Sequence, residues 1–208
     1  MLKFVHSTNL NPQTSPQNAA NDDAPDGAPS QPVGLVAQIL EDWNTHGRDS
    51  TRPGFQAIAV HRFGNWRMGI GPKIVRAPFS IVYRILYRGV RNFYGIELPY
   101  TARVGRRVTI EHQSGIVIHG AAQIGDDCVI RQGVTLGNQS PDRPHEAPKI
   151  GNRVNIGAGA KLLGPVRVGD GARIGANAVV IADVPAGALA VGVPARVRGT
   201  EPHGEPSK

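Results

Sequence analysis

The chain has 208 residues and a net charge of +7, from 23 Lys and Arg against 16 Asp and Glu. This length suits one folded domain with extensions, and the positive charge favours a partner that carries phosphate, with a small cofactor preferred. Aromatic residues make up only 5% of the chain, so the stacking platform of a nucleic-acid binder is not expected. Cys128 is the only cysteine, which excludes a disulfide framework.

The two ends of the chain are predicted to lie outside the folded region. Residues 1–33 are rich in Asn, Gln, Pro, Ala, Asp and Ser and cannot bury enough surface to offset their ordering entropy, which predicts a disordered tail. Residues 200–208 are predicted to form a flexible tail. The chain shows neither the apolar run of a secretion signal nor an apolar stretch of about 18 residues, so a cytoplasmic location is expected.

Residues 34–98 are predicted to form a small α-helical segment. Apolar residues recur at helical spacing within 34–47, 55–66 and 74–93, which predicts three helices.

The third of these helices combines an apolar stripe with basic side chains. The basic residues are Lys73, Arg76, Arg84, Arg88 and Arg91. A basic amphipathic helix can lie on a membrane surface, but a solvated face on a packed helix is favoured. A packed partner is then expected against the apolar residues Ile81, Val82, Ile85 and Leu86.

Residues 99–199 are organised by a six-residue repeat. Branched aliphatic residues, often followed by glycine, recur mostly at intervals of six: Val104, Ile110, Ile124, Ile130, Leu136, Ile150, Ile156, Leu162, Val168, Ile174 and Val180. Four residues after many of them comes a second small or apolar residue, such as Val108, Ser114 or Cys128. This period predicts short strands around a triangular prism, with the aliphatic residues pointing inward. A β-sandwich is the alternative, but its turns recur at spacings nearer about 8 to 12 residues.

The repeat is interrupted twice. The frame shifts in the unit after Ile116, across residues 117–123, before the period returns. Between Leu136 and Ile150 the interval is 14 residues (150 − 136), and the polar, proline-rich residues 138–149 predict a loop thrown out of the prism. Function is expected where the repeat is interrupted.

Glu111 and His112 stand where other units carry the glycine after the aliphatic residue. An imidazole can take a proton from an alcohol at neutral pH when another group holds its tautomer. Adjacent side chains of a strand point to opposite faces, so Glu111 is not automatically that group. A surface feature at a turn is the alternative interpretation of this pair.

The loop at 138–149 adds Asp142, Arg143 and His145 to the candidate residues. Such a loop can reach from one subunit to the next. The chain contains no HExxH motif, no paired cysteines and no clustered His and carboxylate spacing, so no metal site is predicted.

These motifs resemble the catalytic domain of serine acetyltransferases, members of the left-handed parallel β-helix acyltransferase superfamily. The likeness covers residues 99–199 without gaps and runs through 111–117 (Glu-His-Gln-Ser-Gly-Ile-Val), 132–137, 148–150, 156–164 and 192–196. It implies a mainly β fold, a left-handed parallel β-helix preceded by the small α-helical segment, which is an exception to the usual crossover hand. It also implies a homotrimer, with acetyl-CoA lying between neighbouring prisms.

The resemblance assigns roles to residues by position. His112 matches the catalytic base and Glu111 its orienting carboxylate. Ala147 stands where the family has its second active-site histidine, and His145 lies two residues earlier, so the loop histidine is expected to be displaced or altered in role. Arg143 resembles the arginine that meets the carboxylate of the acceptor.

The resemblance also implies a site for acetyl-CoA along the later coils. The backbone at Ala158 and Ala176 would meet the pantetheine, and Arg196 would approach the nucleotide phosphates. An amino-acid acceptor further needs an anion for its ammonium group, because burying either charge unpaired is costly. Asp49 or Asp142 could supply that anion.

Three functions are weighed. The first is an acetyl-CoA-dependent O-acetyltransferase of the serine type. The second is an O-acetyltransferase acting on a sugar hydroxyl in exopolysaccharide biosynthesis. It is a serious rival because most of the family's long helical domain and its isoleucine-terminated tail are missing. The third is a non-catalytic β-helix scaffold, which has no need of Glu111 and His112 or of the polar loop.

Overall fold

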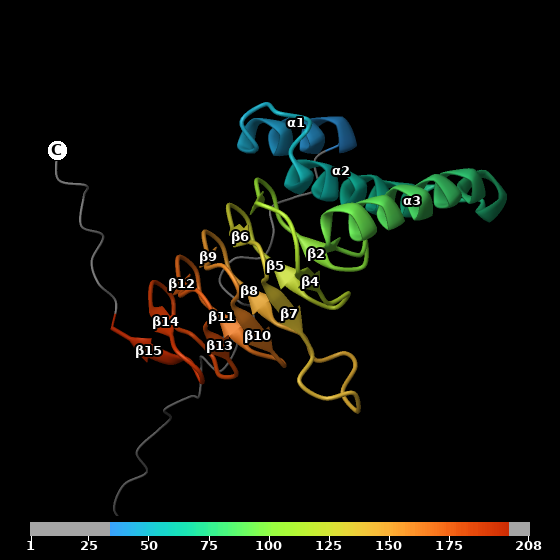
Figure 1. The fold of residues 1–208 in the computed structure, drawn as a ribbon. Helices are drawn as coiled ribbons and strands as arrows, with labels where there is room; N and C mark the ends of the chain where they lie inside the picture. The colour runs from blue at the N-terminus through green and yellow to red at the C-terminus, as the bar shows by residue number, and fades with distance from the viewer. Residues whose placement is uncertain (1–33, 200–208) are drawn as a thin grey trace, which may run out of the picture.

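The computed structural model describes residues 34–199, which form a helical segment followed by a parallel β-helix (Figure 1). The helices are α1 (Leu35–Thr45), α2 (Pro53–Trp66), the short 3-10 helix η1 (Arg67–Gly69) and α3 (Lys73–Tyr94). The predicted disordered and flexible tails, 1–33 and 200–208, lie outside the described residues.

The strands form three sheets, one for each face of a prism. The first contains β1 (Ile96–Glu97), β4 (Ile116–Ile118), β7 (Thr135–Gly137), β10 (Lys161–Leu163) and β13 (Val179–Val180). The second contains β2 (Arg103–Val104), β5 (Gln123–Ile124), β8 (Lys149–Ile150) and β11 (Arg167–Val168). The third contains β3 (Thr109–Glu111), β6 (Val129–Arg131), β9 (Asn155–Ile156), β12 (Arg173–Ile174), β14 (Leu189–Val191) and β15 (Arg196–Arg198).

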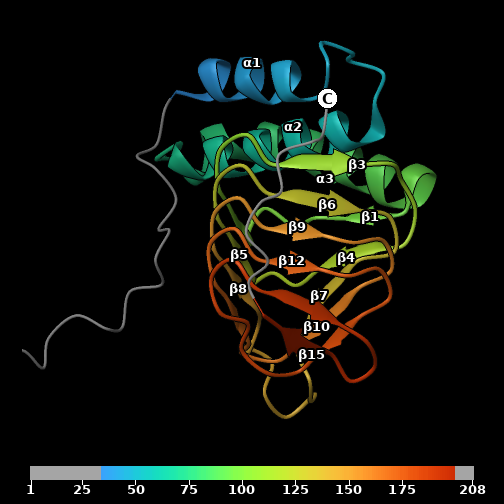
Figure 2. The ribbon, with the colours of Figure 1, turned by 90° about the vertical axis from the view of Figure 1, so that its left-hand side faces the viewer.

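From β1 to β13, successive strands fall on the three sheets in rotation, which is the path of a chain wound round a triangular prism. All pairings between named strands are parallel except that of β14 with β15. Figure 2 shows the coils stacked below the helical segment. The predicted parallel β-helix and the preceding helical segment are therefore confirmed.

The repeated aliphatic residues fill the interior of the prism. Within the third sheet, Ile110 pairs with Ile130, which pairs with Ile156 and then Ile174, and all four are buried. Each coil thus places its aliphatic side chain directly on that of the coil before it. Two residues of the repeat are less buried than the pattern predicts: Val104 is only partly buried, and Ser114 is exposed.

The first interruption lies earlier than the sequence predicts. Glu111 pairs with Arg131, and Val117 pairs with Thr135. Between these two paired positions the chain advances six residues in one coil (117 − 111) but only four in the next (135 − 131). The two additional residues therefore fall between Glu111 and Val117, and not within 117–123. Inward-facing residues must keep their register with the next coil, so the surplus is accommodated in the exposed turn.

The second interruption is located as predicted. The chain leaves the prism after β7 and returns at β8, and the residues between them project as a loop from its side (Figure 1).

The helical segment covers the end of the prism where the coils begin (Figures 1 and 2). The side chains of Arg62 in α2 and Asp42 in α1 form a buried ion pair, with 2.9 Å between Nε and Oδ2. The same guanidinium donates to the carbonyl oxygens of Val104 and Gly105, at 2.7 and 2.5 Å. The Arg62 guanidinium is therefore paired with a carboxylate and hydrogen-bonded to two carbonyl oxygens. These partners offset the cost of burying its charge.

Helix α3 differs from the prediction in its packing. It runs outward beyond the prism (Figure 1), and the apolar residues that were expected to face a partner are exposed: Ile81 by 58%, Val82 by 45%, Ile85 by 63% and Leu86 by 44%. Within the described residues these side chains therefore lack the packed partner that their amphipathic pattern indicates.

Two buried histidines join the helices to the prism. The Nδ1 of His61 lies 3.1 Å from the carbonyl oxygen of Pro99, and its Nε2 lies 2.9 Å from Nδ2 of Asn65. Burial lowers the pKa of His61 from 6.5 to about 3, and the nearby Arg62 acts in the same direction. Burial also lowers the pKa of His46. Both imidazoles are therefore neutral in the folded protein at neutral pH.

These shifts predict that the protein loses stability in mild acid. Below pH 6.5 the unfolded chain takes up a proton on His61 and the folded chain does not, so the loss grows as the pH falls towards 3. At about pH 5 His61 alone should remove roughly 2 kcal/mol of unfolding free energy. Urea unfolding at about pH 8 and pH 5 measures this change. The His61→Gln variant should show a smaller pH dependence, whereas His119→Gln should keep it; equal dependence in all three proteins would contradict the assignment.

Candidate active site

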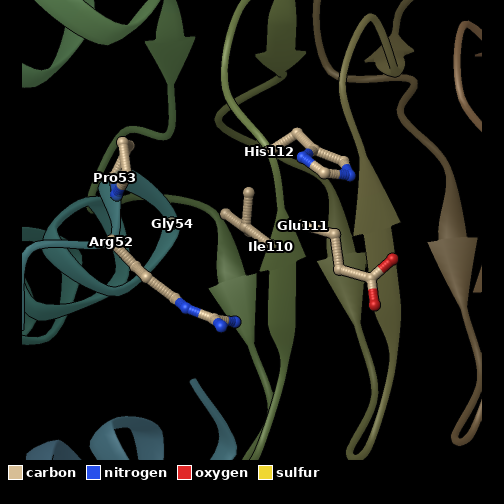
Figure 3. A pocket seen from close by; sticks show the side chains of 6 residues that line it. All are labelled: Arg52, Pro53, Gly54, Ile110, Glu111 and His112. Atoms are coloured by element: carbon tan, nitrogen blue, oxygen red, sulfur yellow. The ribbon is translucent and has the colours of Figure 1, made fainter. Parts of the chain in front are cut away.

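His112 and Glu111 lie beside a pocket at the junction of the helical segment and the first coils. The pocket is lined by Arg52, Pro53, Gly54, Ile110, Glu111 and His112 (Figure 3) and has a volume of about 420 Å³. Strand β3 ends at Glu111, and His112 opens the turn with φ = +64°. The additional residues of this turn leave the imidazole exposed instead of stacked on the next coil.

Helix α2 meets β3 at Gly54, the residue that follows Pro53 at the start of the helix. A Cβ on Gly54 would lie 2.1 Å from the carbonyl oxygen of Ile110, which is far inside van der Waals contact. Only glycine therefore lets α2 approach the strand this closely.

A buried histidine makes a second contact with β3. The Nε2 of His46 accepts a hydrogen bond from the backbone N–H of Ile110 at 3.2 Å, and its Nδ1 lies 2.6 Å from the carbonyl oxygen of Asp42. Because the first contact requires Nε2 as acceptor, Nδ1 carries the proton and donates it to Asp42. These contacts hold the strand immediately before Glu111 and His112.

The carboxylate of Glu111 is paired across the sheet with Arg131. Their Oε2 and Nε atoms are 2.8 Å apart, and Arg131 also donates to the side-chain oxygen of Asn155. In Figure 3 the Glu111 carboxylate and the His112 imidazole both extend away from Arg52. Sequence reasoning missed Arg131, because its pairing with Glu111 requires the length of one coil to be known.

Arg52 is a second residue that sequence reasoning missed. It precedes Pro53 at the start of α2, and its guanidinium reaches the pocket (Figure 3). Its Nε lies 3.8 Å from Oδ2 of Asp49. The backbone N–H and hydroxyl of Thr51 both donate to Asp49, and these hydrogen bonds lower the pKa of its carboxyl group. One cation thus lines the pocket beside His112, and one anion lies next to that cation on the same chain.

The loop candidates lie apart from this pocket within the described chain. Asp142, Arg143 and His145 are exposed, and Arg143 is 3.4 Å from the carboxylate of Glu146 within the same loop. None of them lines the pocket beside His112. A single chain therefore does not bring Asp142, Arg143 or His145 together with His112.

Ala158 and Ala176, two of the residues predicted to contact acetyl-CoA, lie along the same edge of the prism as His112. Turns of successive coils are joined there by backbone hydrogen bonds, from Gly133 to Ser114, from Gly159 to Gln132 and from Asn177 to Ala158, at 2.8 to 2.9 Å. This ladder runs from the turn that contains His112 past Ala158 to the turn that contains Ala176. Arg196 is exposed at the start of β15, the strand paired with β14 in the last coil.

The placement of the described side chains gives no support for a metal site. Across residues 34–199, no group of three or more His, Cys, Asp or Glu side chains is arranged to hold a metal ion. The single thiol, Cys128, is buried in the core, and burial raises its pKa to about 12.

Comparisons with known proteins agree with this geometry. A family model described as bacterial transferase hexapeptide (six repeats) matches residues 147–182, which places the prism among the hexapeptide-repeat transferases. The chain is 41% identical over 144 residues to the serine acetyltransferase of Helicobacter pylori strain J99, covering 69% of this chain and 80% of the relative. The protein therefore belongs to the serine acetyltransferase family.

Other relatives are longer than the part that this chain matches. The serine acetyltransferase of Mycobacterium tuberculosis is 42% identical over 147 residues, which is 71% of this chain and 61% of that protein. Among solved structures, soybean serine acetyltransferase aligns with a TM-score of 0.67 at 31% identity, covering 79% of this chain and 69% of that one. The chain thus spans about three fifths of the length of the mycobacterial relative.

The close approach at Gly54 generates a test of how the pocket is built. Gly54→Ala should lower the free energy of unfolding by roughly 1 to 3 kcal/mol, because the new Cβ displaces α2 from β3. Gly89→Ala is the matched control: a Cβ there meets nothing within 4 Å, so its effect should be neutral or stabilising by about 1 kcal/mol. Urea unfolding measures the free energy of unfolding of both variants. Equal values for the two variants would show that α2 is not held at this contact.

Proposed function

We propose that this protein is an acetyl-CoA-dependent O-acetyltransferase of the serine type. The proposal rests on one observation: His112 stands exposed at the head of the prism edge that carries the turns of Ala158 and Ala176. A thioester bound along that edge would reach the imidazole. Family membership supports the same chemistry, and a solved structure of the serine acetyltransferase from Brucella abortus, 29% identical with a TM-score of 0.65, is a complex with coenzyme A.

In this proposal His112 serves as general base and then as general acid. Its imidazole takes the proton of the acceptor hydroxyl as the oxygen attacks the thioester carbonyl, and it returns that proton to the departing thiolate. Backbone N–H groups along the edge stabilise the oxyanion. Glu111, itself paired with Arg131, is the proposed carboxylate that orients the imidazole.

Serine is the proposed acceptor because Arg52 in the pocket and Asp49 next to it could each pair with one of its charges. Arg52 lines the pocket and is suited to the carboxylate, since a guanidinium binds carboxylates through two hydrogen bonds. Asp49 beside it is suited to the ammonium group. Arg143 and Asp142 would act only if the loop of a neighbouring chain reached this pocket, and His145 would join His112 by the same route.

We also propose a homotrimer, because the exposed edge beside His112 and the projecting loop can be brought together only between chains. Each acetyl-CoA would then lie between two prisms, with Arg196 near its phosphates. Two side chains on the prism, Val117 and Ile181, are 41% and 48% exposed and suit a protein contact.

A sugar hydroxyl is the second candidate acceptor. The exposed loop carries Asp142, Arg143 and His145 as polar groups, and Arg143 lies 3.4 Å from Glu146 within it. A sugar acceptor needs neither charged partner and can use the polar groups of the same open loop.

Replacing His112 tests the catalytic role. His112→Asn removes the base while keeping a residue that tolerates φ = +64°, so turnover should fall by about 10² to 10⁴-fold. Steady-state kinetics gives the turnover, and calorimetry should show unchanged acetyl-CoA binding.

Two further asparagine variants serve as comparisons for His112. His119→Asn should retain activity, because His119 only accepts a hydrogen bond from the backbone of Ala121. His145→Asn should lose activity only if the loop of another chain completes the site. A fully active His112→Asn enzyme would exclude this mechanism.

The acceptor is tested by comparing thiol release from acetyl-CoA with L-serine and with a polysaccharide precursor. Arg52→Gln should raise the KM for L-serine about tenfold or more, equivalent to roughly 1.4 kcal/mol, with the KM for acetyl-CoA unchanged. Arg48→Gln is the matched control, since Arg48 is exposed and bonds only to Asn44. Serine turnover at the background rate of hydrolysis, with clear transfer to the sugar, would reverse the order of the two acceptors.

A further inference from the structure

A second polar pocket lies in the helical segment, away from His112. It is lined by Arg67, Met68, Arg76, Ser80, Tyr83, Arg84 and Tyr100 and has a volume of about 360 Å³. Its residues come from η1, from the outward-running helix α3 and from the segment that leads into the prism. The pocket contains three guanidinium groups and no carboxylate.

Arg67 is buried, and no carboxylate forms an ion pair with it within the described residues. Its residue exposure is 7%, and its guanidinium lies 4.4 and 4.5 Å from the ring centroids of Tyr83 and Tyr100. It donates to Ser80 Oγ at 3.0 Å, while its buried Nε has no hydrogen-bond partner within the described part of the chain. Aromatic faces and a hydroxyl attract a cation, but they do not neutralise it. A buried charge is expected to have an anion beside it.

Helix α3 places two more cations at the same pocket. Arg76, Ser80 and Arg84 are spaced by four residues, so their side chains lie along one face of the helix. Neither Arg76 nor Arg84 forms an ion pair within residues 34–199. Helix α3 carries no acidic residue between Lys73 and Tyr94. The like charges therefore converge with nothing in the described chain to offset them.

We propose that this pocket binds the phosphate group of a ligand. Guanidinium groups bind phosphate oxygens through paired hydrogen bonds, and a dianion would neutralise two of the three cations. The contacts of Arg67 with the rings of Tyr83 and Tyr100 hold its guanidinium in place before a ligand arrives, which reduces the entropic cost of binding. The proposal goes beyond acetyl transfer and does not depend on it, because no residue of this pocket lines the one beside His112.

Two sources of phosphate fit this chemistry. A small phosphorylated molecule could occupy the pocket by itself. A lipid headgroup could do so while the exposed residues of α3, such as Ile81 and Ile85, contact the apolar part of a membrane surface. None of the helices within the described residues is long and apolar enough to cross a membrane, so any such contact would be at the surface.

The first experiment measures binding of inorganic phosphate to the full chain by calorimetry, at an ionic strength held constant with chloride. Saturable binding with one phosphate per chain is expected, together with a rise in Tm that follows the phosphate concentration. In parallel, co-sedimentation is measured with phosphatidylcholine vesicles that contain or lack phosphatidylglycerol.

Three charge-matched variants assign the binding to the pocket. Arg76→Gln and Arg84→Gln should each weaken binding about tenfold or more, whereas Arg88→Gln should change it less than twofold. Arg88 lies on the same helix and is exposed, but it does not line the pocket. Arg76 and Arg84 are at least partly exposed, so these variants should fold, which a Tm measurement without phosphate checks.

Each outcome bears on the proposal. Phosphate binding that depends on Arg76 and Arg84 supports a small ligand, and vesicle binding with the same dependence supports a lipid headgroup. Absence of both kinds of binding would overturn the proposal. Equal weakening by Arg88→Gln would also overturn it, because the attraction would then come from the charge of the whole helix.

Discussion

The structure depends on the register between successive coils. Each strand bonds to the strand one coil away, so an aliphatic side chain such as Ile130 must lie directly between Ile110 and Ile156. This constraint leaves no room inside the prism for additional residues. Surplus chain is forced outward, in the turn that carries His112 and in the loop between β7 and β8. The regularity of the core is therefore what exposes the candidate catalytic residue.

The helical segment completes the site because three contacts fix it to the first coils. The buried pair of Arg62 and Asp42 bonds the coil at Val104, His46 bonds the strand at Ile110, and Gly54 allows α2 to touch that strand. Through these contacts Arg52 reaches the pocket beside His112. A site assembled from helix and coil in this way can change its acceptor through the helical residues while the prism edge stays the same.

The positive charge of the chain is gathered in places that suit phosphate. On the prism, Arg196 lies at the end farthest from His112, where the proposed acetyl-CoA would place its nucleotide. In the helical segment, Arg67, Arg76 and Arg84 share a pocket without a carboxylate. The net charge indicated a phosphate-bearing partner, but it could not show that the cations form separate groups.

The sequence by itself determined the prism and the position of His112, because a six-residue period and its interruptions are local patterns. It also located the three helices, whose bounds follow apolar spacing. Only the tertiary structure decided which residues meet: Glu111 with Arg131, Arg52 with the pocket, and Arg67 with two tyrosines. These contacts join residues 16 or more positions apart (83 − 67 for Arg67 and Tyr83), so they depend on coil length and helix packing, which no local pattern contains. For the same reason the exposure of Ile81 and Ile85 could not be predicted, since amphipathic spacing shows that a face is apolar but not what covers it.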